Sequence, residues 1–312
     1  MNRQTMRNKM KLLAVVAGGL LLAGSFSLAS GGAGFVGNEK CKECHDEVAA
    51  SHGKSLHARA WSGKGESYGC ESCHGAAGEH VSNPSKSNII GFGKESKASA
   101  EQQSKQCLEC HSATVAVSMW DMGLHKKNDV ACSSCHSIHK DGKVVTKDPE
   151  TCFTCHKDIK RDVNKQSHHP IIEGKIKCSS CHNPHGTLSH GMIKDENINQ
   201  LCYQCHADKR GPFIWEHPPV EENCLSCHGP HGTKAAKLLK EKVPNLCQNC
   251  HGGSGGHNVT PYDATAGFKG SAAATTKEKL VARSCLNCHT NIHGSMAPAS
   301  GTGANGGKAF AR

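Results

Sequence analysis

The feature that most constrains this chain is the pentapeptide C-x-x-C-H, which occurs ten times in 312 residues. Every one of the 20 cysteines belongs to a repeat: Cys41 and Cys44, Cys70 and Cys73, Cys107 and Cys110, Cys132 and Cys135, Cys152 and Cys155, Cys178 and Cys181, Cys202 and Cys205, Cys224 and Cys227, Cys247 and Cys250, Cys285 and Cys288. The histidines that close the repeats are His45, His74, His111, His136, His156, His182, His206, His228, His251 and His289. Any interpretation must therefore explain the histidine as well as the cysteine pair.

Cysteines at this density occur in disulfide scaffolds, zinc sites and proteins with covalent haem. Disulfides and zinc sites built from paired C-x-x-C segments both leave the histidine after every second cysteine without a role. Haem c attachment uses all three groups, since two thiols add to the vinyl groups and the imidazole binds the iron. The repeats therefore predict ten haem c groups, and each pentapeptide is expected to span about one helical turn.

Thirteen of the 23 histidines lie outside the repeats and are candidates for the second axial position of each iron. Their places relative to the repeats nominate ten distal ligands: His57, His80, His125, His139, His169, His185, His217, His231, His257 and His293. His52, His168 and His190 are left over, and of the adjacent His168 and His169 we prefer His169. Two imidazoles per iron leave no open position for a substrate, which predicts electron transfer at low potential and no catalytic residues.

The repeats group in twos, because one extra histidine lies between the two members of a pair and another follows the second member. This spacing predicts a short lead at 30–40, a decahaem domain at 41–293 and a flexible Gly-, Ala- and Ser-rich tail at 294–312. A polar linker is expected at 84–104. The decahaem domain consists of five two-haem modules, at 41–80, 107–139, 152–185, 202–231 and 247–293.

Composition predicts the fold class. Only 36% of the residues are hydrophobic and 4% aromatic, so side chains alone make a poor core and the porphyrins must fill it. Glycine and proline interrupt the chain, and no apolar periodicity lasts long enough for a long helix or a sheet. We expect a multihaem cytochrome c that is elongated and mostly irregular coil, with short α-helices, a haem-filled core and little or no β-sheet.

Residues 1–29 have the pattern of a secretory signal peptide, with four basic residues before an apolar run at 12–23 that is short for a bilayer span. Cleavage is expected after Ala29, and the alternative of an uncleaved anchor is disfavoured by Gly18 and Gly19 within the run. The exported chain would have no lipid-spanning segment. Its formal charge falls from +10 to +6, and haem propionates outweigh that charge, so nucleic-acid binding is not expected.

Several stretches resemble the MtrA/DmsE/PioA-type family of periplasmic decahaem cytochromes. They are N-D-V-A-C-S-S-C-H-S-I-H at 128–139, C-S-S-C-H-N-P-H-G at 178–186, A-D-K-R-G-P-F-I-W-E-H-P-P-V-E-E-N-C-L-S-C-H at 207–228 and R-S-C-L-N-C-H-T-N-I-H-G-S at 283–295. The family's distal histidines fall on the ten residues nominated above. The resemblance implies a periplasmic protein inside an outer-membrane β-barrel porin. Its implied partners are periplasmic or inner-membrane electron-donor cytochromes and an extracellular multihaem cytochrome or terminal reductase.

Three other functions remain open at this point: a free periplasmic electron shuttle or store, a multihaem reductase and a polymerising extracellular filament. A reductase would be expected to have one irregular repeat, for example with lysine in place of histidine, and all ten repeats here are regular. The interpretation is an electron carrier, with the direction of electron flow left undetermined.

Overall fold

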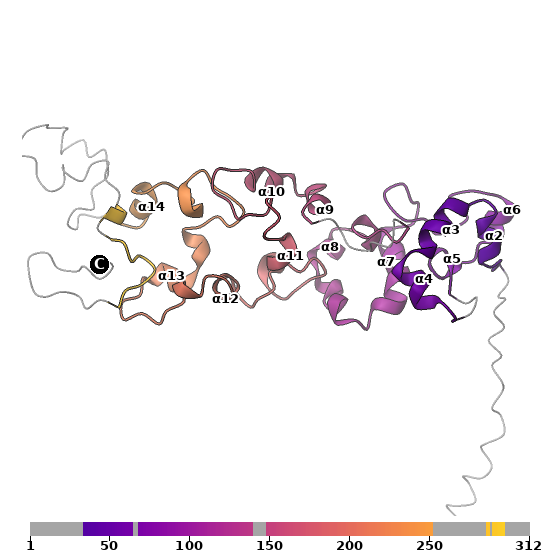
Figure 1. The fold of residues 1–312 in the computed structure, drawn as a ribbon, viewed down its shortest axis with the longest axis horizontal. Coiled ribbons are helices and arrows are strands. Elements are labelled where there is room, and N and C mark those ends of the chain that lie inside the picture. Colours follow the sequence, from indigo (N-terminus) through magenta and orange to yellow (C-terminus); the bar gives the residue numbers. More distant parts are fainter. Residues whose placement is uncertain (1–33, 65–67, 140–147, 252–284, 288, 297–312) are drawn as a thin grey trace, which may run out of the picture.

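The computed structural model describes residues 34–64, 68–139, 148–251, 285–287 and 289–296. The chain is elongated, and its short helices extend along the long axis from an N-terminal group to a C-terminal group (Figure 1). The N-terminal helices α2 (Asn38–Lys42) to α6 (Gly78–Ser82) lie at one end, and α13 (Pro218–Glu222) and α14 (Asn245–Gln248) lie toward the other. The predicted elongated arrangement of short helices and irregular coil is confirmed.

The remaining helices between these ends are mostly one or two turns long. The α-helices are α3 (Asp46–Gly53), α4 (Leu56–Trp61), α5 (Cys70–His74), α7 (Ala100–His111), α8 (Leu124–Lys127), α9 (Glu150–Phe153), α10 (Lys157–Asp162), α11 (Cys178–Cys181) and α12 (Ile198–Tyr203). The 3-10 helices are η1 (Val115–Val117), η2 (Trp120–Met122), η3 (Cys132–Ser134), η4 (His190–Met192), η5 (Ala207–Lys209), η6 (Cys224–Ser226), η7 (Ala236–Leu238) and η8 (Cys285–Asn287).

Each repeat forms one helical turn, as predicted. The histidine N–H donates to the carbonyl of the first cysteine, for example at 3.0 Å in His45 and 2.9 Å in His206. In a module the first repeat lies at the end of a helix that begins before it, such as α12. The second repeat starts a new turn at its first cysteine, such as η6. This i to i+4 geometry places the cysteine and histidine side chains within one turn of each other.

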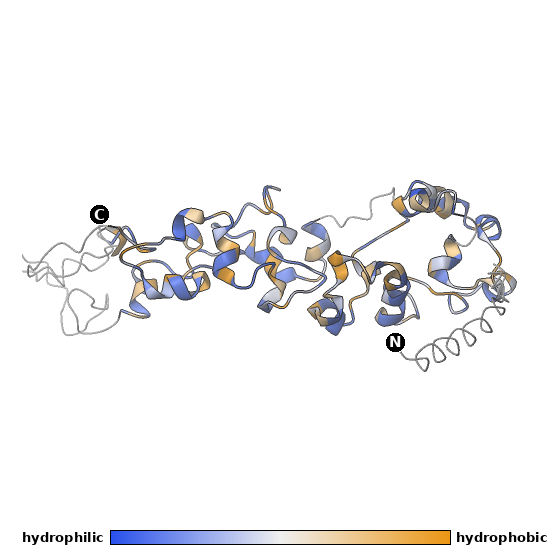
Figure 2. Ribbon diagram, turned by 90° about the horizontal axis from the view of Figure 1, so that it is seen from below, coloured by the Kyte–Doolittle hydropathy of each residue, from blue (hydrophilic) through white to orange (hydrophobic). Residues whose placement is uncertain are grey.

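The polypeptide has very few buried apolar side chains. In the described ranges they are Ala77, Trp120, Ala131, Val163, Ile171, Ile193 and Ala235. Apolar and polar residues are interspersed along the ribbons (Figure 2). Side chains of this number and size do not form an ordinary hydrophobic core for a domain of this length.

Strand pairing is limited to isolated bridges in the part of the chain that the structure describes, which confirms the expectation of little or no sheet. The bridges join Ser167 to Thr233, His182 to Ile193, Trp215 to Ser295 and His228 to Leu239. In the part of the chain that the structure describes, no helix has the length and apolar character needed to cross a bilayer.

The segment at 84–104, which the sequence predicts as a polar linker, makes several hydrogen bonds with α7. Ser99 caps α7, accepting from the Gln102 N–H at 3.1 Å and donating its own N–H to the Gln102 side chain at 2.8 Å. Gln103 is buried and bonds both to Gly93 N–H and to the Ala98 carbonyl. The segment therefore folds back onto its own helix, which its composition did not reveal.

Candidate haem sites

Nine histidines outside the repeats each lie opposite a repeat histidine in the described part of the chain. The structure pairs nine of the nominated distal histidines with repeat histidines, with ring centroids between 5.9 and 6.3 Å apart. The pairs are His45–His80, His57–His111, His74–His139, His125–His156, His136–His185, His169–His206, His182–His231, His217–His251 and His228–His293. Of the tenth nominated set, His257 lies outside the described residues, as does Cys288.

This separation fits one metal ion between two imidazoles. Metal–imidazole bonds of about 2.0–2.1 Å place the centroids of two rings on opposite sides of one ion about 6 Å apart. The planes of seven pairs lie between 15° and 42° of each other, whereas His125–His156 lies at 69° and His57–His111 at 90°. The donor set therefore fits an iron with two axial imidazoles at each described repeat.

Most ring pairs combine one histidine from each of two neighbouring modules. His125, in the second module, faces His156 of the third, while His185 of the third module faces His136 of the second. The same reciprocal exchange occurs at the other three junctions: His57–His111 with His74–His139, His169–His206 with His182–His231, and His217–His251 with His228–His293. Only at the N-terminal end of the described chain do the two rings, His45 and His80, belong to one module.

At least seven of these histidines are oriented by a backbone carbonyl in the described part of the chain. Their ring Nδ1 atoms lie 2.6–3.0 Å from the carbonyl oxygens. The contacts are His74–Ile90, His80–Ser85, His125–Pro184, His169–Pro230, His182–Gly191, His185–Ala116 and His228–Lys237. An Nδ1–H bonded to a carbonyl fixes the tautomer and the ring orientation and leaves Nε2 for a metal.

Burial favours the neutral form of many of these rings. It lowers the pKa of His57, His74, His139, His185, His217, His228, His231 and His293 below the usual value. The neutral imidazole is the form that binds a metal, so the environment prepares these side chains for ligation.

The three remaining histidines have different surroundings. His168 uses both ring nitrogens, Nδ1 with the Lys165 carbonyl and Nε2 with Glu173 at 3.0 Å, and the Glu173 contact raises its pKa. A histidine held in this way has no free nitrogen for iron, so the geometry favours its neighbour His169. His190 is exposed in η4.

His52 lies beside the His74–His139 pair, with its ring centroid 6.2 Å from that of His139 and 6.0 Å from that of Trp61. His52 is therefore a third imidazole beside the two that form this pair. Spacing alone gave no indication of this position, because His52 and His139 are contributed by different modules.

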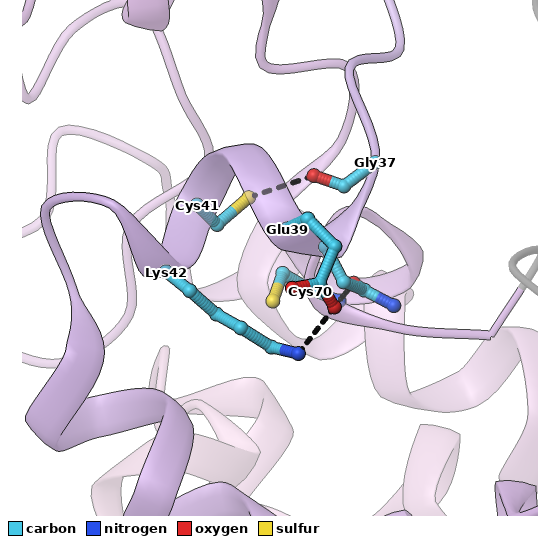
Figure 3. A network of polar contacts seen from close by, with 6 residues as sticks. Gly37, Glu39, Cys41, Lys42 and Cys70 are labelled. Carbon is cyan, nitrogen blue, oxygen red and sulfur yellow. Dashed lines mark hydrogen bonds and ion pairs between the residues drawn. The ribbon is translucent and has the colours of Figure 1, made fainter.

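The two repeats of a module meet through their first cysteines. The sulfur atoms of Cys41 and Cys70 are within hydrogen-bonding reach, and burial together with the Cys70 thiol raises the pKa of Cys41 to about 11. Figure 3 shows these two side chains on neighbouring helices, α2 and α5. The corresponding pairs are Cys107–Cys132, Cys152–Cys178, Cys202–Cys224 and Cys247–Cys285.

Successive modules approach each other through their second cysteines. After burial, the largest influence that raises the pKa of Cys73 is the charge of Cys110, and the same relationship holds for Cys181 and Cys205 and for Cys227 and Cys250. Cys135 has Cys152 and Cys155 as its corresponding neighbours. First cysteines therefore meet within a module, and second cysteines lie near cysteines of the next module.

A side chain just before the first repeat clamps the second repeat in four modules. It accepts the N–H of the second repeat's first cysteine: Asn38 from Cys70 at 2.8 Å, Ser104 from Cys132 at 3.3 Å, Asp148 from Cys178 at 2.9 Å and Asn199 from Cys224 at 2.8 Å. We call these residues the clamp residues. Our sequence reasoning missed them, although a small polar residue three or four positions before the first cysteine was a detectable signal.

Trp120 offers an additional polar group beside a ring pair. Its ring centroid is 6.4 Å from that of His185, its side chain is buried, and its Nε1–H has no acceptor among the described residues. A buried donor without a protein partner is unfavourable, and a haem propionate is an acceptor of suitable chemistry. This observation also fits a haem at the His136–His185 pair.

Comparisons with known proteins agree with this geometry. Residues 168–211 and 217–256 match a family model described as a doubled CXXCH motif, and residues 70–147 match one described as a cytochrome c-type protein, NrfB-like. The multiheme cytochrome MtrA of Shewanella baltica (strain OS185) is 43% identical over 274 residues, covering 84% of this chain and 79% of that protein. The chain therefore binds haem c, transfers electrons and belongs to the MtrA family of multihaem cytochromes.

Proposed function

We propose that this chain carries ten haem c groups, each attached to the two cysteines of one repeat and ligated by the repeat histidine and one distal histidine. The observation that carries the proposal is the set of nine imidazole pairs with centroids 5.9–6.3 Å apart. His289 and His257 would supply the tenth pair. The bound iron supplies a one-electron couple.

The protein's own residues favour carriage of electrons over turnover of a substrate. Paired imidazoles would occupy both axial positions, so no ligand position is left for a reactant. The Nδ1–carbonyl contacts hold the rings in place, as at His169 and Pro230. The modules extend along the long axis from one end of the molecule to the other, which supports a conducting role from end to end (Figure 1).

We further propose that the protein is the periplasmic part of a porin–cytochrome complex at the outer membrane. It would exchange electrons with periplasmic or inner-membrane donor cytochromes on one side and with an extracellular multihaem cytochrome or terminal reductase on the other. Support comes from the similarity to MtrA and from the linear arrangement of the modules (Figure 1). Residues 1–29 would direct export and be removed, although they lie outside the described residues.

Intact mass and fractionation test the two levels of the proposal separately. The mature protein, beginning at Ser30, should have the mass of the polypeptide plus ten haems. The double variant Cys178→Ala/Cys181→Ala should carry nine haems. In the native host, detergent extraction of outer membranes should release the cytochrome together with a β-barrel protein. Recovery wholly in the soluble periplasm would contradict the porin role and leave a shuttle, without affecting the haem count.

A further inference from the structure

The clamp residues differ in charge between modules. Asn38, Ser104 and Asn199 contribute a neutral amide or hydroxyl oxygen, whereas the third module uses the carboxylate of Asp148. One Asp148 oxygen accepts from Cys178 N–H at 2.9 Å and the other from Ser179 N–H at 3.0 Å. The clamp function is common to the four modules, but the negative charge occurs in the third alone.

This charge lies where two haem attachment points meet. A carboxylate oxygen of Asp148 and the sulfur atoms of Cys152 and Cys178 all lie within 4.8 Å of one another. These cysteines belong to the repeats that end at His156 and His182, so the carboxylate adjoins the attachment points of both haems of the module. Asp148 also has no basic partner in an ion pair among the described residues.

Asp148 is ionised at neutral pH. Burial opposes ionisation, but the N–H groups of Ser179 and Cys178 outweigh it, and the pKa of Asp148 is lower than usual. A fixed negative charge favours ferric over ferrous iron, because reduction removes one positive charge. At an effective dielectric constant of about 20, a unit charge about 10 Å away changes such an equilibrium on the order of tenfold.

We propose that the Asp148 carboxylate lowers the reduction potentials of the two haems of the third module relative to those of the fourth. The inference rests on the proposed haem ligation. An electron would then be less favoured on the haems of the third module than on those of the fourth.

The fourth module is a suitable comparison. The third and fourth modules each place a lysine near the second repeat, since Lys194 N–H donates to the Cys181 carbonyl and Lys240 N–H to that of Cys227. Both lysines lower the pKa of the adjacent cysteine, so this positive charge is matched. The first module is less suitable, because the charge of Glu71 already acts on Cys41 there.

The experiment compares Asp148→Asn with Asn199→Asp in the full-length mature protein. Asn199→Asp adds a charge but also loses the two hydrogen bonds that the Asn199 amide donates to the Val220 and Glu221 carbonyls, so its stability is measured beside its haem loading. Haem loading is checked by intact mass and the low-spin spectrum, and potentials are then measured by redox titration followed with EPR. The His125–His156 and His57–His111 sites should both give strongly anisotropic EPR signals, which distinguishes them from the other described sites. Within this class each site is identified by the loss of its signal in His156→Ala or His111→Ala, and the His57–His111 site, two repeats away, serves as an internal control.

In Asp148→Asn, the ferrous-to-ferric ratio at the His125–His156 site should rise on the order of tenfold at a fixed potential. This change corresponds to a shift of about 59 mV for one electron. The His57–His111 signal should remain unchanged. In Asn199→Asp, about two of the ten haems should become harder to reduce.

Fully loaded Asp148→Asn protein with unchanged potentials would overturn the inference. If Asp148→Asn matures with fewer haems, Asn199→Asp becomes the test. Unchanged potentials in fully loaded Asn199→Asp protein would then overturn the inference. Absence of low-spin haem signals from the unmodified protein would count against the proposed function and not against the role of Asp148.

Discussion

The imidazole rings of His136 and His185 lie 6.0 Å apart with their planes at 23°, although they belong to different modules. The reciprocal pair, His125 and His156, crosses the same junction in the opposite direction. Each junction between modules is therefore crossed by two pairs of facing imidazoles. A module separated from its neighbours would lose distal ligands, so the domain is expected to mature as one unit.

Replacement of a distal histidine should change the spin state of one iron. In His185→Ala, the site of His136 would lose one axial ligand, and a high-spin ferric EPR signal of about one-tenth of the total iron should appear. His52→Ala is the matched control, because His52 adjoins the ring of His139 without facing a repeat histidine at 6 Å. A high-spin signal in His52→Ala, with none in His185→Ala, would contradict the ligand assignment.

The EPR spectrum of the oxidised protein should contain two classes of low-spin centre. The sites at His57–His111 and His125–His156, with ring planes at 90° and 69°, should give strongly anisotropic signals. Sites such as His45–His80 and His228–His293, both at 15°, should give rhombic signals. His111→Ala should remove part of the anisotropic signal and leave the rhombic one. A spectrum without the anisotropic class would show that the ring angles differ from those described.

The contact between His168 and Glu173 should depend on pH. The Glu173 carboxylate raises the pKa of His168 above 6.5, and His168 lowers the pKa of Glu173 below 4.5. The histidine contribution is fully present below pH 6.5 and is lost as pH rises through the higher, folded-state pKa. The glutamate contribution is present above pH 4.5 and is lost as pH falls through the lower, folded-state pKa.

Hydrogen exchange in residues 168–174, corrected for the intrinsic pH dependence, should therefore be slower near pH 6 than near pH 9. Glu173→Gln should remove most of this difference. If the difference persists in Glu173→Gln, another titrating group is responsible.

Loss of a clamp residue should destabilise the contact between the two repeats of a module. Asn199 is buried and makes three hydrogen bonds, to Cys224 N–H and to the carbonyls of Val220 and Glu221. Asn199→Ala leaves these groups unpaired, which should reduce the free energy of unfolding by about 2–3 kcal/mol.

Guanidinium unfolding followed by far-UV circular dichroism measures the effect. Asn197→Ala is a suitable control, because Asn197 only caps α12 through Gln200 N–H, and its loss should cost about 1 kcal/mol. Equal losses in the two variants would show that the clamp adds nothing beyond a helix cap.

Gly69 is expected to be intolerant of a side chain because of the clamp in the first module. A Cβ atom at Gly69 would lie 2.0 Å from the Asn38 side-chain oxygen that accepts the Cys70 N–H. Gly69→Ala should therefore destabilise the protein by about 1–3 kcal/mol in the same unfolding experiment. Gly53→Ala, at the end of α3, should be neutral or slightly stabilising, because nothing lies within 4 Å of its Cβ. Similar stability of the two variants would contradict the close packing of Asn38.

Several properties followed from the sequence because they are local. Attachment of haem needs two thiols and one imidazole within five residues, and the one-turn geometry of those residues follows from a single i to i+4 hydrogen bond. The scarcity of apolar side chains likewise predicted short helices and irregular coil. The nominated histidines were found by spacing alone, and nine of them face a repeat histidine in the described part of the chain.

Tertiary structure alone decided which histidines share a site. His125 is nearer in sequence to His136 than to His156, yet it faces His156 of the next module. The choice between His168 and His169 depended on Glu173 and on the Pro230 carbonyl, which a linear pattern cannot bring together. Local chemistry thus determined where haem is attached, whereas contacts between distant segments determined which imidazoles meet and where the Asp148 charge lies.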